Sequence, residues 1–137
     1  MYHGELTMYL SGLDDASVRT LQDVPALDPF THRFVSTPSF DPDLAADADL
    51  TIVALDAEAT WVLQDFLEDK DDSCDVIALA PAGRSAETAG LLSRLSDIWP
   101  DDMPASELVW RFEGWQRRCK ERADALETAQ FLEATIN

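Results

Sequence analysis

Three aspartates stand where predicted strands give way to predicted helices, and their chemistry suits phosphate or cation binding. Asp56 follows the apolar run 50–55, and Asp14 and Asp15 follow the first predicted strand. A carboxylate at the carboxyl end of a strand can accept a phosphoryl group, bind a hard cation such as Mg²⁺, or cap the next helix. The sequence therefore offers one candidate site, with Asp56 at its centre.

Apolar runs alternate with amphipathic segments along the first hundred residues. The pattern predicts strands at 5–10, 32–37, 50–55, 75–80 and, very short, at 97–100, and helices at 14–24, 40–48, 57–69 and 85–97. Strands that alternate with helices favour right-handed crossovers and a parallel sheet covered on both faces. Five such units in about 105 residues fit a flavodoxin-like α/β sheet of order 2-1-3-4-5, in which ligands bind beyond the carboxyl ends of the strands.

Two of the helices have predictable buried faces. In the segment 14–24, capped by Asp14 or Asp15, Val18 and Leu21 are expected to face inward. The helix at 57–69 is expected to bury Trp61, Val62, Leu63 and Phe66.

The last segment, 104–137, is predicted to be one helix of about 34 residues and about 50 Å, longer than a domain of this size needs. We expect an α/β domain at 1–103, with the helix closing it and continuing towards a further domain. The predicted seam has a core-facing first half and a pairing second half: Leu108, Phe112, Trp115 and Cys119, then Leu126, Ala129, Leu132 and Ile136. Trp110 and Trp115 cannot both face the core, and the second half predicts a homodimer.

Composition excludes several classes of function. The 137 residues carry 27 Asp and Glu against 10 Lys and Arg, a formal charge of −17, which argues against nucleic-acid or anionic-membrane partners. No apolar run reaches the ~20 residues of a membrane span, and no signal peptide is evident, so a cytoplasmic location is expected. Cys74 and Cys119 are interpreted as free thiols, and His3 and His32 as surface residues.

The segments "DLTIVALD" and "DIWPDDMPASELVWRF" give the chain a resemblance to the receiver domains of bacterial response regulators, over residues 5–118. The resemblance implies an acidic pair after the first strand, a phosphate-accepting aspartate ending the third, a hydroxyl ending the fourth and a lysine ending the fifth. In such a site Mg²⁺, the hydroxyl and the ammonium group together offset the phosphoryl charge.

The sequence departs from that pattern. Asp14 and Asp15 lie beyond the strand edge, and the acceptor position is Ala54 when counted from Asp49 but Asp56 when counted from the strand end. The hydroxyl and lysine positions hold the residues Ala80 and Asp101, and the only lysines are Lys70 and Lys120.

These departures favour a degenerate receiver in which Asp56 is a capping or solvated residue and no cofactor is needed. The alternatives are a functional receiver, with phosphate on Asp56 and Mg²⁺ held by Asp14, Asp15 and Asp56, and a module that binds a small ligand through Arg84 and the strand-edge cleft. No catalytic triad or metal-thiolate spacing is present, so the chain is not expected to be an enzyme itself.

The last forty residues carry a second resemblance. The segment "DIWPDDMPASELVWRFEGWQRRCK", followed by "LETAQFLEATIN", is similar to the N-terminal region of bacterial sensor proteins in which a pseudo-receiver precedes a PAS domain and a GGDEF diguanylate cyclase domain. The resemblance implies a regulatory and dimerising module that controls a downstream cyclase.

Overall fold

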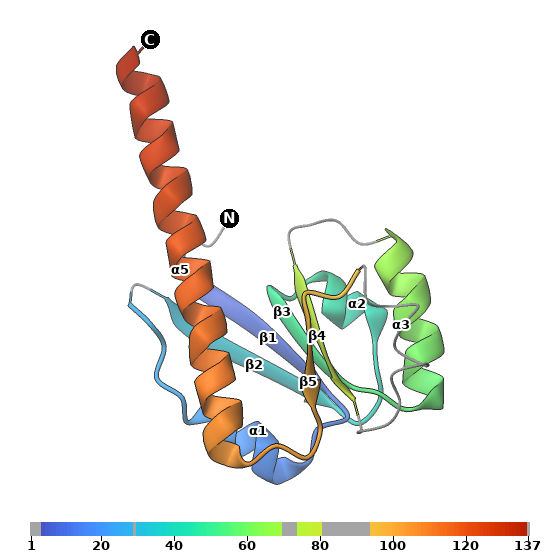
Figure 1. Cartoon of the computed structure of the whole chain (residues 1–137). Helices are drawn as coiled ribbons and strands as arrows, with labels where there is room; N and C mark the ends of the chain where they lie inside the picture. Colours follow the sequence, from blue (N-terminus) through green and yellow to red (C-terminus); the bar gives the residue numbers. More distant parts are fainter. Residues whose placement is uncertain (1–3, 29, 70–73, 81–93, 137) are drawn as a thin grey trace.

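A five-stranded parallel sheet forms the centre of the molecule (Figure 1). The computed structural model describes residues 4–28, 30–69, 74–80 and 94–136, with only the backbone at 57–58 and 134–136. The strands are β1 (Glu5–Ser11), β2 (Thr31–Thr37), β3 (Leu50–Ala54), β4 (Asp75–Ala80) and β5 (Asp97–Pro100). Their order is β2-β1-β3-β4-β5 and every pairing is parallel, so the predicted fold class is confirmed.

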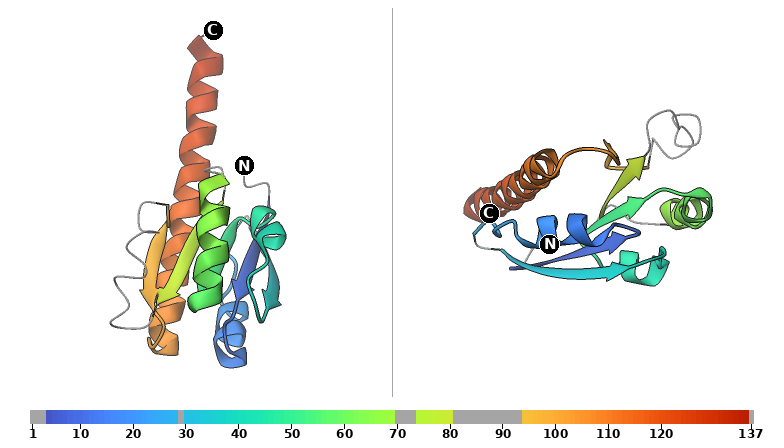
Figure 2. Two further views of the ribbon diagram at one scale, coloured as in Figure 1. Left: turned by 90° about the vertical axis from the view of Figure 1, so that its right-hand side faces the viewer. Right: turned by 90° about the horizontal axis from the view of Figure 1, so that it is seen from below.

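Helices cover both faces of the sheet, as right-handed crossovers require. They are α1 (Asp15–Gln22), α2 (Pro42–Ala46), α3 (Ala57–Asp69) and α5 (Ala105–Ile136). Figure 2 shows α1 and α5 on one face and α2 and α3 on the other. Most of the helix predicted at 85–97 falls within the segment 81–93, which lies outside the described residues. The last residue of that prediction, Asp97, instead begins β5.

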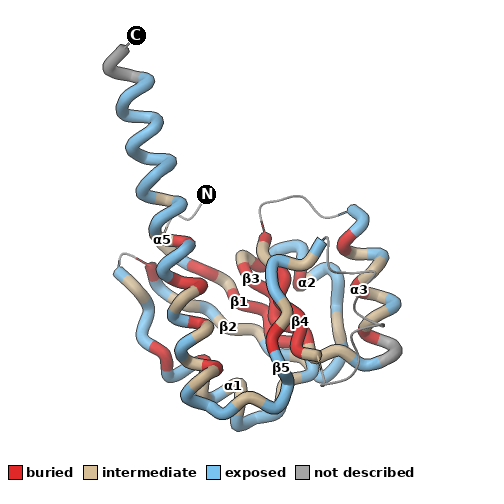
Figure 3. Tube along the Cα trace, viewed as in Figure 1, coloured by how far each residue is buried: buried red, intermediate tan, exposed pale blue. Residues whose placement is uncertain are grey.

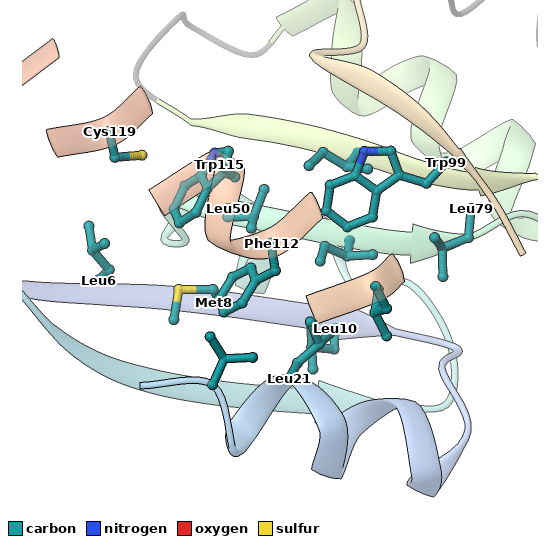
Figure 4. Packing of buried hydrophobic residues seen from close by; sticks show 14 of the residues in the cluster. Leu6, Met8, Leu10, Leu21, Leu50, Leu79, Trp99, Phe112, Trp115 and Cys119 are labelled. Atoms are coloured by element: carbon teal, nitrogen blue, oxygen red, sulfur yellow. The ribbon is translucent and has the colours of Figure 1, made fainter. Parts of the chain in front are cut away.

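The larger core lies between the sheet and the pair α1 and α5 (Figure 4). Strand β1 contributes Leu6, Met8 and Leu10 to it, because alternate residues of a strand share one face. Helix α5 contributes Phe112 and Trp115, whose rings stack with centroids 6.0 Å apart. Strand β3 has buried residues on both faces, as expected of a central strand in a parallel sheet.

The opposite face has a smaller core, and one prediction for it is wrong. Helix α3 buries Ala59, Leu63 and Leu67, whereas Trp61 is 73% exposed. Each helical residue turns about 100°, so Trp61 lies roughly 200° from Leu63 and cannot share its face. Val62 and Phe66, also expected inside, are only partly buried.

Helix α5 extends well beyond the sheet, and its outer part is exposed (Figure 3). The predicted core-facing residues Leu108, Phe112, Trp115 and Cys119 are all buried within the domain, and Trp110 is 65% exposed. We define the α5 extension as residues 124–136; its side chains described at 124–133 are all exposed. Among the described residues, no helix is long and apolar enough to cross a membrane.

Candidate functional site

Asp56 is bound to the first turn of α3. Its carboxylate Oδ1 accepts the backbone N–H of Ala59 at 2.7 Å. Its carbonyl oxygen accepts the Thr60 hydroxyl at 2.7 Å and the Thr60 N–H at 3.0 Å. This is the hydrogen-bonding pattern of a helix N-cap, and it occupies one oxygen of the carboxylate with the helix itself.

Asp14 has the same role at α1. Its Oδ1 accepts the Ser17 N–H at 2.7 Å, so the prediction that Asp14 or Asp15 caps this helix is confirmed for Asp14. The hydrogen bonds from the backbone and side chain of Ser17 lower the pKa of the Asp14 carboxyl. Asp15 follows as the acidic residue of the first turn, where the helix dipole favours an anion.

The three aspartates do not form a metal-binding group. In the part of the chain that the structure describes, there is no set of three or more His, Cys, Asp or Glu side chains placed to hold a metal ion. Asp14 and Asp56 each cap a different helix, and Asp14 is held beyond the end of β1. The Mg²⁺ ligand set expected from Asp14, Asp15 and Asp56 is therefore not brought together.

A pocket of about 210 Å³ lies at the carboxyl edge of β1 and β3. Ser11, Gly12, Ser39 and Asp56 line its polar part, and none of the described residues lining it is basic. Gly12 has φ +75°, and a Cβ at this position would lie 3.4 Å from the Ala54 Cβ. The chain turns sharply at Gly12 as it leaves β1, so Ser11 and Gly12 occupy the strand edge where the receiver resemblance implies an acidic pair.

Ala80 and Asp101, at the positions where the receiver resemblance implies a hydroxyl and a lysine, lie together at the carboxyl edge of the sheet. Ala80 pairs with Pro100 across β4 and β5, and the Asp101 N–H donates to the Ala80 carbonyl oxygen at 3.2 Å. Lys120 lies elsewhere, because its Nζ donates at 3.3 Å to the carbonyl oxygen of Asp28, which precedes β2 at the opposite edge of the sheet. Lys70, Arg84 and His3 lie outside the described residues.

A tyrosine network, not foreseen from the sequence, fixes the loop beside the pocket. The buried Tyr9 hydroxyl lies 2.5 Å from the Thr37 Oγ1 and 3.2 Å from the carbonyl oxygen of Ser39. It also accepts the Asp41 N–H at 2.8 Å. Because Tyr9 points away from the larger core, only its place in the alternation of β1 could have suggested this role.

His32 is not the isolated surface residue that the sequence suggested. Its Nε2 lies 3.0 Å from the Gln116 Oε1, and its ring packs against Phe34 and Phe112. Burial lowers the pKa of His32, although the hydrogen bond to Gln116 acts in the opposite direction. His32 therefore helps to hold α5 on the sheet.

Asp75 anchors α5 at the start of β4. Its carboxylate accepts Trp115 Nε1–H at 2.7 Å, an Arg122 N–H at 2.9 Å and the Ser96 hydroxyl at 3.3 Å. Burial raises the pKa of Asp75, but the hydrogen bonds from Arg122, Trp115 and Ser96 and the charge of Arg122 outweigh it. The pKa of this carboxyl therefore lies below its ordinary value.

The sheet order and the helices on both faces define a flavodoxin-like α/β domain with a receiver-like fold. A solved structure agrees: that of a CpaE2 pilus assembly protein from Sinorhizobium meliloti 1021 is 14% identical, covers 79% of this chain and 98% of its own, and superposes with a TM-score of 0.54. At this identity the likeness concerns the fold alone. No protein-family model and no curated protein matches the sequence.

Proposed function

We propose that this domain is a pseudo-receiver: a regulatory module of a bacterial signalling protein that works without being phosphorylated. The observation that carries the proposal is the charge at the carboxyl edge, where Ala80 and Asp101 replace a hydroxyl and an ammonium group and none of the described residues lining the pocket is basic. At a separation of roughly 6 Å and an effective dielectric constant of about 20, each unit charge pair is worth about 3 kcal/mol. Because Asp101 and a phosphoryl group on Asp56 would both be negative, this energy would oppose phosphorylation.

The capping role of Asp56 also opposes its phosphorylation. A phosphoryl group on the Asp56 carboxylate would compete with the hydrogen bond to Ala59 N–H. Losing a side-chain N-cap destabilises a helix by about 1 kcal/mol. Phosphorylation would thus weaken α3, and the described residues that line the pocket include no cation to compensate.

The proposed output is α5. Leu108, Phe112 and Trp115 are buried within the domain, so they cannot contact a second copy. The proposed dimer contact is therefore limited to residues of the α5 extension: Leu126, Ala129, Leu132 and Ile136. A helix segment that exposes leucines such as Leu126 and Leu132 is marginal alone, and a second copy would cover them. The resemblance to sensor proteins with PAS and GGDEF domains makes a diguanylate cyclase in the same polypeptide the proposed target.

The phosphorylation state can be tested with beryllofluoride, a mimic of the aspartyl phosphoryl group. The protein is titrated with beryllofluoride and Mg²⁺ while the amide resonances of residues 56–60 are followed by NMR. We expect no saturable shift. A saturable shift at these amides would favour the alternative, a functional receiver that accepts phosphate on Asp56 with Mg²⁺.

The double variant Ala80→Ser/Asp101→Lys is the matched comparison, because it places a hydroxyl at position 80 and an ammonium group at position 101. We expect it to bind beryllofluoride more tightly than the native protein. If it binds no better, the charge at positions 80 and 101 is not what prevents phosphorylation.

A further inference from the structure

Helices α2 and α3 lie on the face of the sheet opposite α5 (Figure 2). A groove of about 490 Å³ is lined by residues of both helices. Its floor is apolar and comes from both helices and the residue before β4: Pro42, Ala46, Val62, Phe66 and Cys74. Three aspartates, Asp43, Asp65 and Asp69, complete the lining, and none of the described residues in it is basic. The groove thus combines an apolar floor with an acidic rim.

Two of the three rim aspartates, Asp65 and Asp69, have no evident structural role, whereas Asp43 lies in the first turn of α2, where the helix dipole favours an anion. Asp65 and Asp69 are one turn apart on α3, where like charges destabilise a helix slightly. Within the described ranges, no ion pair involves Asp43, Asp65 or Asp69, and all three residues are exposed. On the α3 side, the rim therefore carries negative charge that the described part of the domain does not itself use.

Trp61 stands beside this groove. It precedes Asp65 by one helical turn, and it is the most exposed large apolar side chain described, at 73%. Tryptophan at a protein surface is typical of residues that dominate binding energy, because it buries a large area at a low cost in conformational entropy. The same wall of α3 thus carries an aromatic anchor and two of the three rim aspartates.

We propose that this groove docks a basic amphipathic helix of a partner protein. Aliphatic side chains of the partner would cover Val62 and Phe66, its Lys or Arg side chains would pair with the rim aspartates, and its edge would contact Trp61. Charge selects the occupant: every described charged residue of the groove lining is an aspartate, so the groove attracts a basic segment. The domain would then receive its partner on one face and act through α5 on the other.

The test uses a synthetic Lys/Leu amphipathic peptide of about 18 residues, or five turns. A Glu/Leu peptide of the same apolar pattern is the charge-reversed control. Binding is measured by calorimetry and located by amide shifts in NMR spectra of the whole domain. We expect the Lys/Leu peptide to shift residues of α2 and α3, and the Glu/Leu peptide to shift none.

Matched variants separate this groove from general attraction to an acidic protein. Asp65→Asn/Asp69→Asn and the control Glu113→Gln/Asp124→Asn remove the same charge, from the groove and from exposed positions on α5. We expect the groove variant to weaken binding roughly tenfold, as two ion pairs would, and the control to change it far less. Equal weakening by both variants, or shifts centred on α5, would overturn the proposal. So would sedimentation showing that Asp65→Asn/Asp69→Asn alters self-association, because the occupant would then be a second copy.

Discussion

Replacing Asp75 by asparagine tests how α5 is anchored to the sheet. The carboxylate receives the Trp115 indole N–H at 2.7 Å, Arg122 at 2.9 Å and Ser96 at 3.3 Å. Asparagine has nearly the same shape, so it leaves the packing of Trp115 intact. It removes the charge, and its amide group can accept fewer of these hydrogen bonds.

The size of the effect follows from the burial of each partner. A hydrogen bond to a charged group contributes about 1.5–3 kcal/mol, and the buried Trp115 makes one. The Arg122 side chain is 50% exposed, so solvent screening limits its ion pair to about 0.5 kcal/mol. Since the asparagine oxygen still accepts one bond, we expect Asp75→Asn to lower the free energy of unfolding by about 2 kcal/mol.

Urea unfolding at several pH values is the assay. Because the pKa of Asp75 is lower in the folded protein than its ordinary value of 3.8, its stabilising effect is present above that value and is lost as the pH falls through the folded pKa. The difference between native protein and Asp75→Asn should therefore be full at neutral pH and shrink in acid. Arg122→Ala, as a comparison, should cost much less.

Two results would refute this reasoning. A difference at neutral pH below about 0.5 kcal/mol, the size of a surface ion pair, would mean that Asp75 is not an anchor. A difference that stays constant through the acid range would mean that the charged form of Asp75 is not what stabilises α5.

Three further predictions concern other parts of the chain. Leu132→Glu should abolish dimer formation in sedimentation experiments, because it places like charges in the proposed seam, and Glu127→Gln should not; a dimer that survives contradicts the seam. Asp56→Ala should destabilise the domain to urea by about 1 kcal/mol through loss of the α3 cap, whereas Asp56→Asn, which can still cap, should have little effect. Gly12→Ala should cost about 1 kcal/mol or more, because φ is +75° there; a neutral result in the same assay would contradict the tight turn.

Helices and strands that are marked by a pattern of neighbouring apolar residues were predictable from the sequence. The apolar run that forms β3 has the pattern of a covered parallel strand, and the spacing of Leu108, Phe112 and Trp115 gave the buried face of α5. Even the four-residue β5 was foreseen at 97–100. In each case neighbouring residues carry the whole signal, so no tertiary information was needed.

Features that depend on tertiary contacts were not predictable. The exposure of Trp61 depends on which face of α3 the sheet covers, and hydrophobicity alone assigned it to the core. The partners of Asp75 come from residues 21 to 47 positions away in sequence. The metal site predicted from Asp14, Asp15 and Asp56 also depends on tertiary structure. Asp14 and Asp56 each cap a separate helix, and their positions after strands in the sequence do not reveal this.

The length of α5 beyond the last of its described buried residues makes it a lever. Cys119 is that residue and the helix reaches Ile136, so 136 − 119 = 17 residues span about 25 Å. A tilt of about 5° at the base, where Trp115 and Arg122 meet Asp75, would move the tip by about 2 Å. Shifts of that size at helix interfaces are enough to switch proteins between states. A rearrangement almost invisible inside the domain would thus be amplified at the far end.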